Sequence, residues 1–160
     1  MFDKKILPLS DSLYRMARSI LQDADEAHDA VQDLLMNLWE KRNELADVEN
    51  LNAFVFRSLR NKSLDMLRKR RYNNEELDNT VSESNTPYEQ TEQQDMVGRV
   101  HFFIEHLPEL QRTIIRMRDV EGMEIQEIAD ITEITPNAVR VNLSRARQKI
   151  REQIIKENSI

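Results

Sequence analysis

The sequence lacks cysteine and contains two glycines and four prolines among its 160 residues. Without cysteine, the chain has no disulfide bond and no thiolate metal site, which suits a reducing cytoplasm. The scarcity of glycine and proline, together with abundant Leu, Ile, Glu, Arg and Gln, predicts an all-helical protein. Also missing are an apolar run of about 18 residues and a basic leader followed by an apolar segment. We therefore expect a cytoplasmic protein with no direct insertion into a membrane.

The net charge of −6 is unusual for a protein that binds nucleic acid, but the charges are separated along the chain. Residues 54–72 carry seven Lys or Arg against one Asp, and residues 134–151 carry five against none. Residues 22–50 carry nine Asp or Glu against two Lys or Arg, and residues 73–97 carry seven against none. Such blocks are better explained by several different partners than by solubility alone.

The segment from 124 to 152 is expected to form a helix-turn-helix. Thr135 and Pro136 are typical of a helix start, because the hydroxyl can accept a bond from a free N–H and proline has no N–H to leave unpaired. In the helix that follows, apolar residues recur with a helical period at Val139, Leu143, Ala146 and Ile150. The opposite side is polar or cationic and consists of Asn137, Arg140, Val141, Ser144, Arg145, Arg147, Gln148 and Arg151. A capped cationic helix after a tight turn is the arrangement that enters the DNA major groove.

A second candidate surface lies on a helix expected over residues 25–43. Its core stripe consists of Ala27, Val31, Leu34, Leu35 and Leu38. The far side gathers Asp25, Asp29, Asp33 and Glu40 around Met36, with Gln32 and Trp39 at the border. An apolar side chain among carboxylates is typical of a surface that binds a protein partner, because cations meet the acids while the apolar patch is desolvated.

Two other interpretations of this acidic face remain open. It can be a solvated helix face whose Met36 is merely exposed. Clustered carboxylates can also hold Mg²⁺ in a metal-assisted hydrolase. The sequence disfavours the hydrolase, because it has no phosphate-binding glycine loop, no Glu-x-x-His pair and no nucleophile and base pair. We therefore expect neither an enzyme nor a cofactor.

A basic helix is expected over residues 53–72. The apolar residues Val55, Leu59 and Met66 share one side, and Arg57, Arg60, Arg68 and Arg71 share the other. A row of long cationic side chains can follow a phosphate backbone. The aromatic residues Phe54, Phe56 and Tyr72 can stack on unpaired bases, although core packing is the simpler expectation for the two phenylalanines.

The remaining segments complete a helical chain. Residues 1–8 are expected to be a short lead-in, and residues 73–92 a flexible acidic linker. Helices are expected over residues 9–22, over residues 92–106, and from the turn at Leu107 and Pro108 to Gly122. Their expected core residues are Leu9, Leu13, Met16, Ala17, Ile20, Met96, Val100, Phe103, Ile104, Leu110, Ile114, Ile115 and Met117.

Three motifs in this order resemble a known family. They are DADEAHDAVQDLLMNLW, NAFVFRSLRNKSLDMLRKRR and, after the acidic linker, HLPELQRTIIRMRDVEGMEIQEIADITEITPNAVRVNLSRARQKI. Together they are similar to bacterial sigma factors of the extracytoplasmic-function type, in the sigma-70 family. The resemblance implies two small helical domains, 1–72 as region 2 and 93–160 as region 4, joined by a linker over 73–92. It also implies binding to core RNA polymerase at its clamp coiled coil and flap, and to promoter DNA.

The resemblance also implies roles for individual residues. The expected contacts with core polymerase are Asp29, Gln32, Asp33, Met36 and Trp39. The expected contacts with the −10 element are Asn50, Asn52, Arg57, Arg60, Asn61 and Arg68, where the loop over 47–52 would capture a flipped-out base. The expected contacts with the −35 element are Asn137, Arg140, Val141, Ser144, Arg145 and Arg147. The resemblance also implies an anti-sigma factor at the membrane as a partner.

Several positions depart from the family pattern. Glu124 stands where a serine cap is usual, and Glu133 stands where the turn usually has glycine. A glutamate held at positive φ is strained by roughly 1 kcal/mol. Val141 and Asn142 replace a small polar residue and an arginine, so the promoter sequence cannot be inherited from relatives.

Two further hypotheses come from the residues. A stand-alone helix-turn-helix regulator, which would bind duplex operator DNA without polymerase, is the alternative function. Independently, the acidic linker is expected to lie against the basic faces of the free protein and to suppress non-specific DNA binding.

Overall fold

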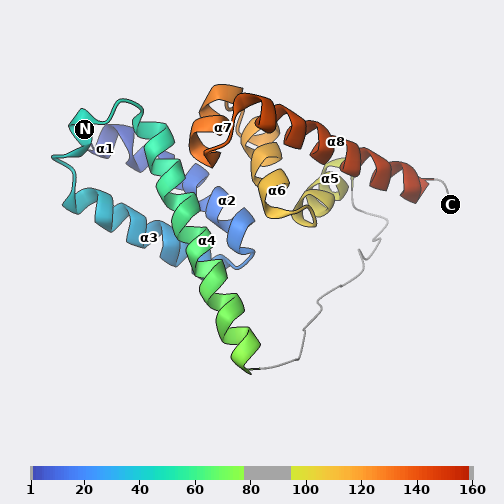
Figure 1. Cartoon of the computed structure of the whole chain (residues 1–160), viewed down its shortest axis with the longest axis horizontal. Coiled ribbons are helices and arrows are strands. Elements are labelled where there is room, and N and C mark those ends of the chain that lie inside the picture. The colour runs from blue at the N-terminus through green and yellow to red at the C-terminus, as the bar shows by residue number, and fades with distance from the viewer. Residues whose placement is uncertain (1, 78–94, 159–160) are drawn as a thin grey trace.

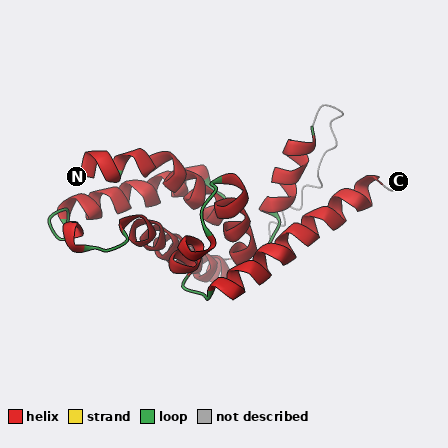
Figure 2. Ribbon diagram, turned by 90° about the horizontal axis from the view of Figure 1, so that it is seen from above, coloured by secondary structure: helices red, strands yellow, loops and turns green. Residues whose placement is uncertain are grey.

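The computed structural model describes residues 2–77 and 95–158, without the side chains of residues 74–77. Every regular element in these ranges is a helix, as the sequence predicted (Figures 1 and 2). None of the described helices is long and apolar enough to cross a bilayer. The expected linker falls largely on residues 78–94, outside the described residues.

The N-terminal domain contains the helices α1 to α4 and two short 3₁₀ turns. Their bounds are Phe2–Lys5 for α1, Leu7–Leu9 for η1, Ser10–Leu21 for α2, Ala24–Glu40 for α3, Leu45–Asp47 for η2 and Leu51–Leu77 for α4. The expected lead-in is thus partly helical, and Phe2 in α1 packs edge-on against the ring of Trp39 at 5.3 Å between centroids. Helix α4 continues past its expected end at Tyr72, since the residues that follow include neither glycine nor proline.

The C-terminal domain contains the helices α5 to α8. Their bounds are Met96–Glu105 for α5, Glu109–Ile115 for α6, Arg116–Val120 for the π-helical turn η3, Ile125–Thr132 for α7 and Pro136–Asn158 for α8. Helix α5 begins where Asp95 Oδ1 accepts a hydrogen bond from Gly98 N at 2.9 Å. The side chain of Met96 is exposed at this first residue, so its predicted core position is wrong.

The second helix of the predicted helix-turn-helix is confirmed, both at its start and along its apolar stripe. Thr135 Oγ1 accepts a hydrogen bond from Ala138 N at 3.1 Å, and α8 then starts at Pro136. The buried residues of α8 are Val139, Leu143, Ala146 and Ile150, as the periodicity predicted. The preceding helix ends with Glu133 at a φ of 60°, and Glu124 at its start makes no side-chain cap.

Each domain buries the side chains that its helical periodicity predicted. The fully or nearly buried set includes Leu13, Met16, Ala17, Ile20, Val31, Leu34, Leu38, Val55, Leu59, Phe103, Ile104, Ile114, Ile115 and Met117. Leu9, Leu35, Met66, Val100 and Leu110 are only partly buried and lie against this core. Phe56 is buried, so the simpler expectation for this ring is confirmed.

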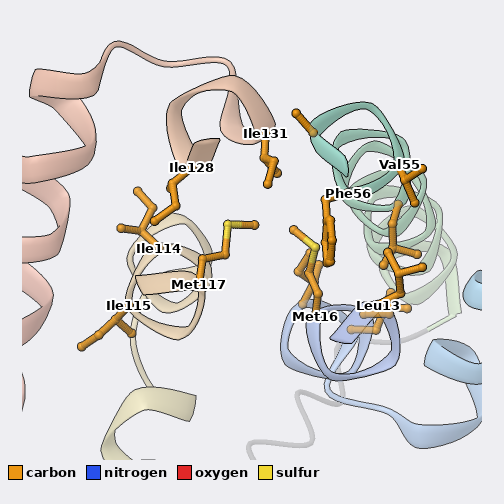
Figure 3. Close-up of a cluster of buried hydrophobic side chains, with 14 of the residues drawn as sticks. Leu13, Met16, Val55, Phe56, Ile114, Ile115, Met117, Ile128 and Ile131 are labelled. Carbon is orange, nitrogen blue, oxygen red and sulfur yellow. The ribbon is translucent and has the colours of Figure 1, made fainter. Parts of the chain in front are cut away.

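The two domains lie against each other. Helix α2 packs on α6, and α4 packs on α7, so that both α2 and α4 face the C-terminal domain (Figure 1). We call this contact surface the interdomain seam. Met16 and Phe56 from one side point toward Met117 from the other (Figure 3), and these three side chains line a cavity of about 160 Å³ at the seam.

Removal of the cap hydroxyl tests the local origin of the helix-turn-helix. For Thr135→Ala, we expect the free energy of unfolding to fall by about 1 kcal/mol, because the N–H of Ala138 loses its acceptor. Urea unfolding followed by circular dichroism measures the change. Thr135→Ser keeps the oxygen and should match the parent chain, and an equal loss in both variants would contradict a capping role.

Candidate nucleic-acid and protein interfaces

Helix α8 presents an open cationic face. Its exposed residues include all of the predicted positions, namely Asn137, Arg140, Val141, Ser144, Arg145 and Arg147. Arg140 and Arg145 take part in no ion pair with the described residues. By contrast, Arg147 donates to both carboxylate oxygens of Asp119, at 3.0 Å and 2.5 Å, and this hydrogen bonding raises the pKa of Arg147. The face can therefore offer two unpaired guanidinium groups to a polyanion.

The outer face of α3 carries the predicted anionic and apolar surface. All five expected residues are exposed, namely Asp29, Gln32, Asp33, Met36 and Trp39. Met36 is 62% exposed, and Trp39 is 48% exposed although it contacts the Phe2 ring and lies 4.1 Å from the guanidinium carbon of Arg42. Asp33 makes a solvent-exposed ion pair with Lys62 at 3.4 Å. Such a pair is weak, so the carboxylate of Asp33 remains available to a cationic partner.

The basic face of α4 is divided, which the sequence did not predict. Arg68 and Asn61 are exposed to solvent. Arg57 instead donates to the carbonyl oxygen of Asp130 at 3.1 Å and forms an ion pair with Glu133 at 3.7 Å. Arg60 forms a shorter ion pair with Glu109 at 3.0 Å, and its side chain is only 12% exposed. The half of this face that is nearest the C-terminal domain is therefore covered by that domain.

The loop before α4 supports a pocket. Asn50 Oδ1 accepts a hydrogen bond from Ala53 N at 3.2 Å and so caps α4, whereas Asn52 is exposed. A pocket of about 500 Å³ lies between α3, this loop and α4. It is lined by Leu34, Asn37, Leu38, Lys41, Glu44, Leu45, Val48, Phe54, Ser58 and Lys62. Its size falls in the range of small-ligand sites, and it combines an aromatic ring with amide, hydroxyl and ammonium groups.

A bidentate ion pair joins the domains beside the cavity. Arg15 donates to both carboxylate oxygens of Glu121, at 2.6 Å and 3.0 Å, and Ser12 donates to the same carboxylate at 3.2 Å. The hydrogen bonds from Arg15, more than its charge, lower the pKa of Glu121. Arg15 is 53% exposed, so solvent weakens this attraction.

A buried arginine also crosses the seam. Arg112 is 7% exposed and donates to the carbonyl oxygens of Leu107 at 2.9 Å and of Ile20 at 3.4 Å. It makes no ion pair with a carboxylate among the described residues, and burial lowers its pKa. Gln22 also donates a hydrogen bond across the seam, from its Nε2 to the carbonyl oxygen of Glu105 at 2.7 Å.

Sequence reasoning missed these seam residues. The paired groups are 49 to 109 positions apart along the chain, so no local spacing relates them. One partial signal was present, because Glu133 occupies a turn position that usually has glycine. The described residues contain no group of three or more His, Cys, Asp or Glu side chains placed to hold a metal ion.

Comparison with known proteins identifies both halves of the chain. The family model for sigma-70 region 2 matches residues 7–72, and the model for sigma-70 region 4 matches residues 98–150. The chain is 27% identical to the RNA polymerase sigma factor SigV of Bacillus subtilis over 91% of this chain and 86% of that protein. It is 20% identical to the ECF RNA polymerase sigma factor SigW of the same organism, over 90% of this chain and 83% of that protein.

A solved structure is similar over almost the whole fold. The sigma factor RpoE of Bartonella quintana, in complex with the anti-sigma factor NepR, superposes with a TM-score of 0.79. The two chains are 26% identical, and the match covers 96% of each.

The seam carboxylate predicts a pH dependence. Because the pKa of Glu121 is lowered in the folded chain, its ion pair with Arg15 stabilises fully at neutral pH and is lost as the pH falls below the ordinary glutamate range. At neutral pH we expect Glu121→Gln to lower stability by about 1 kcal/mol or less, since Arg15 is solvent-screened. The difference between parent and variant urea midpoints should shrink on acidification. A difference that persists undiminished in acid would contradict this assignment.

Proposed function

The chain belongs to the sigma-70 family of RNA polymerase sigma factors, within its extracytoplasmic-function group, and we propose which of its surfaces perform each part of that activity. Sigma factors direct transcription initiation without being enzymes. A stand-alone operator-binding regulator is not favoured, because the region 2 model matches a domain that such a regulator does not need.

We propose that the outer face of α3 binds core RNA polymerase. The observation that supports this most strongly is the exposure of Met36 and Trp39 among the carboxylates of Asp29 and Asp33. A cationic partner would pair with the acids while the two apolar side chains are desolvated, which is the anatomy of a protein interface. By family resemblance, the partner is the clamp coiled coil, and the C-terminal domain engages the flap.

We propose that α4 and its pocket bind the −10 element. Arg57, Arg60 and Arg68 would contact phosphates, and Asn52 and Asn61 would contact the exposed strand. The pocket between α3 and α4 would receive an extruded base against the ring of Phe54. Asn50 is already the cap of α4, so its contribution would be to hold the loop in shape.

We propose that α8 reads the −35 element in the major groove. Its N-terminal residues Asn137, Arg140 and Val141 would meet base edges first, followed by Ser144 and Arg145 one turn later. Arg147 is held by Asp119 and would contact a phosphate. In this proposal, residues 1–72 and 93–160 act as the two promoter-binding domains, in the cytoplasm.

An inhibitory partner is also part of the proposal. The structural relative from Bartonella quintana was solved in complex with an anti-sigma factor. We propose that an anti-sigma factor at the membrane similarly binds this chain between signals.

Charge reversal on α3 tests the polymerase contact. We expect Asp29→Lys with Asp33→Lys to abolish binding to core polymerase and run-off transcription on a genomic fragment library. The fold should be unchanged, since both residues are exposed and the Asp33 ion pair with Lys62 is weak. The matched control reverses Asp3 and Asp11, which are exposed on other helices. Loss of transcription in the control, or normal binding by the α3 variant, would rule out this surface.

Two arginines of α8 should differ in what they recognise. Arg145→Ala should weaken binding to a −35 sequence by about 1 to 3 kcal/mol if its guanidinium holds a guanine edge, with little effect on other DNA. Arg147→Ala should weaken binding to all sequences equally. It should also reduce the slope of log affinity against log salt concentration by about one, the contribution of one phosphate contact. Fluorescence anisotropy with −35 and scrambled duplexes measures both. Equal loss across sequences for Arg145→Ala would make it only a phosphate contact.

A further inference from the structure

The cavity at the interdomain seam is large enough for one small molecule. Its volume of about 160 Å³ is close to that of an apolar cavity, about 150 Å³, that holds one benzene molecule. Its lining includes Arg15, Arg18 and Val120, which are exposed, so a ligand can enter from solvent. None of the lining residues belongs to the surfaces that we assign to polymerase or to promoter DNA. The cavity is therefore a separate candidate site.

The inner wall of the cavity fits an aromatic ring. Met16 and Phe56, from the N-terminal domain, point toward Met117 of the C-terminal domain (Figure 3). Met123 and Tyr14 also line the cavity. Thioether sulfur makes favourable contacts with aromatic rings, and the unbranched methionine side chain adapts to the shape of a ligand. Three methionines and two aromatic side chains therefore favour a planar ring over a branched aliphatic group.

The π-helical turn η3 shapes the C-terminal wall. This wide turn is closed by a hydrogen bond from Glu121 N to the carbonyl oxygen of Arg116 at 2.9 Å. Met123 N donates to the carbonyl oxygen of Met117 at 2.9 Å, and Arg118 donates to the carbonyl oxygen of Met123 at 2.8 Å. These bonds hold both methionines in place in the lining. A single π-helical turn is rare in proteins overall and is frequently found at functional sites.

Two buried polar groups in the lining lack a hydrogen-bond partner among the described residues. They are Arg116 Nε and Ser19 Oγ, and Ser19 is only 9% exposed. The other nitrogens of Arg116 make only long contacts, to Glu105 at 3.7 Å and to His101 at 3.4 Å. Burial lowers the pKa of Arg116 in spite of Glu105. A buried donor without an acceptor is unfavourable, so an anionic oxygen in the cavity would receive charge-assisted hydrogen bonds.

The charges around the cavity also favour an anion. Its lining carries the three cations of Arg15, Arg18 and Arg116 and the two carboxylates of Glu105 and Glu121. Glu121 is already bound to Arg15, which donates to both of its carboxylate oxygens. Glu105 is exposed and lies 3.7 Å from Arg116, so it competes only weakly for that cation. A ligand carboxylate can therefore take its place.

We propose that the seam cavity binds a small aromatic carboxylate, with its ring among the methionines of the inner wall and its carboxylate on Arg116. This site goes beyond the proposed transcriptional function and does not depend on it. Because the walls come from both domains, a bound ligand contacts both at once and adds to the stability of their contact. The concentration of such an acid would then alter how firmly the seam is held.

Benzoate is the probe for this site, and the methionine methyl groups report its binding. In the 160-residue chain, labelled with ¹³C at its seven methionine methyls, ring currents should shift the signals of Met16, Met117 and Met123 as benzoate is added. The shifts should saturate with a dissociation constant of about 1 mM, the range for a ligand of this size. Met36 and Met96 are exposed outside the cavity and should not move, so they serve as internal controls.

A neutral ligand and one substitution test the carboxylate contact. Benzyl alcohol has the same ring without the charge and should bind about tenfold more weakly than benzoate. Arg116→Gln should weaken benzoate binding about tenfold and leave benzyl alcohol binding nearly unchanged. Arg151→Gln, the matched control, removes the same charge from an exposed residue outside the cavity and should keep both parent affinities. Circular dichroism verifies that each variant is folded.

Three results would overturn the proposal. Benzoate shifts that never saturate, or that move Met36 and Met96 equally, would mean non-specific contact only. Equal affinity of the parent chain for benzoate and benzyl alcohol would contradict a carboxylate site, and this comparison needs no variant. Parent affinity in Arg116→Gln, or an equal loss in Arg151→Gln, would contradict the assigned arginine. None of these measurements involves polymerase or DNA, so the proposed function is tested separately.

Discussion

The pairing of two α4 arginines with the C-terminal domain determines which charged surfaces of the chain are exposed. It uses Arg57 and Arg60 internally, while the acids of α3 and the arginines of α8 face solvent. A large protein partner can therefore contact the outer face of α3 without any rearrangement of the chain. The cationic face of α8 is open in the same arrangement, whereas half of the basic face of α4 is covered. This order of access follows from charge placement alone.

The seam combines polar contacts with apolar burial that is continuous with the cores of the two domains. Each core buries a continuous apolar stripe, such as the one on α8 from Val139 to Ile150, and such burial is costly to reverse. The seam adds ion pairs with partly exposed groups and carbonyl bonds from the buried Arg112 to an apolar contact that leaves a cavity. Hydration can replace the ion pairs, but not the burial of Met16, Phe56 and Met117 (Figure 3). Separation of the domains would therefore expose apolar surface as well as break polar contacts.

Local physics explains what could be predicted from the sequence. Helical periodicity and the Thr135 cap predicted the helix-turn-helix, and the exposure of Met36 and Trp39 followed from the α3 pattern. The predicted end of α4 at Tyr72 is too early, because the acidic, polar residues that follow have no apolar periodicity and yet are compatible with a helix. The pairing of Arg60 with Glu109 could not be predicted, because it depends on how two domains meet and leaves no periodic signal.

The central claim is that core polymerase binds the outer face of α3. A photo-reactive amino acid placed at Met36, which is 62% exposed, tests this contact most directly. It should cross-link to core polymerase when the holoenzyme forms. A holoenzyme that forms normally but gives no cross-link from this position would contradict the account.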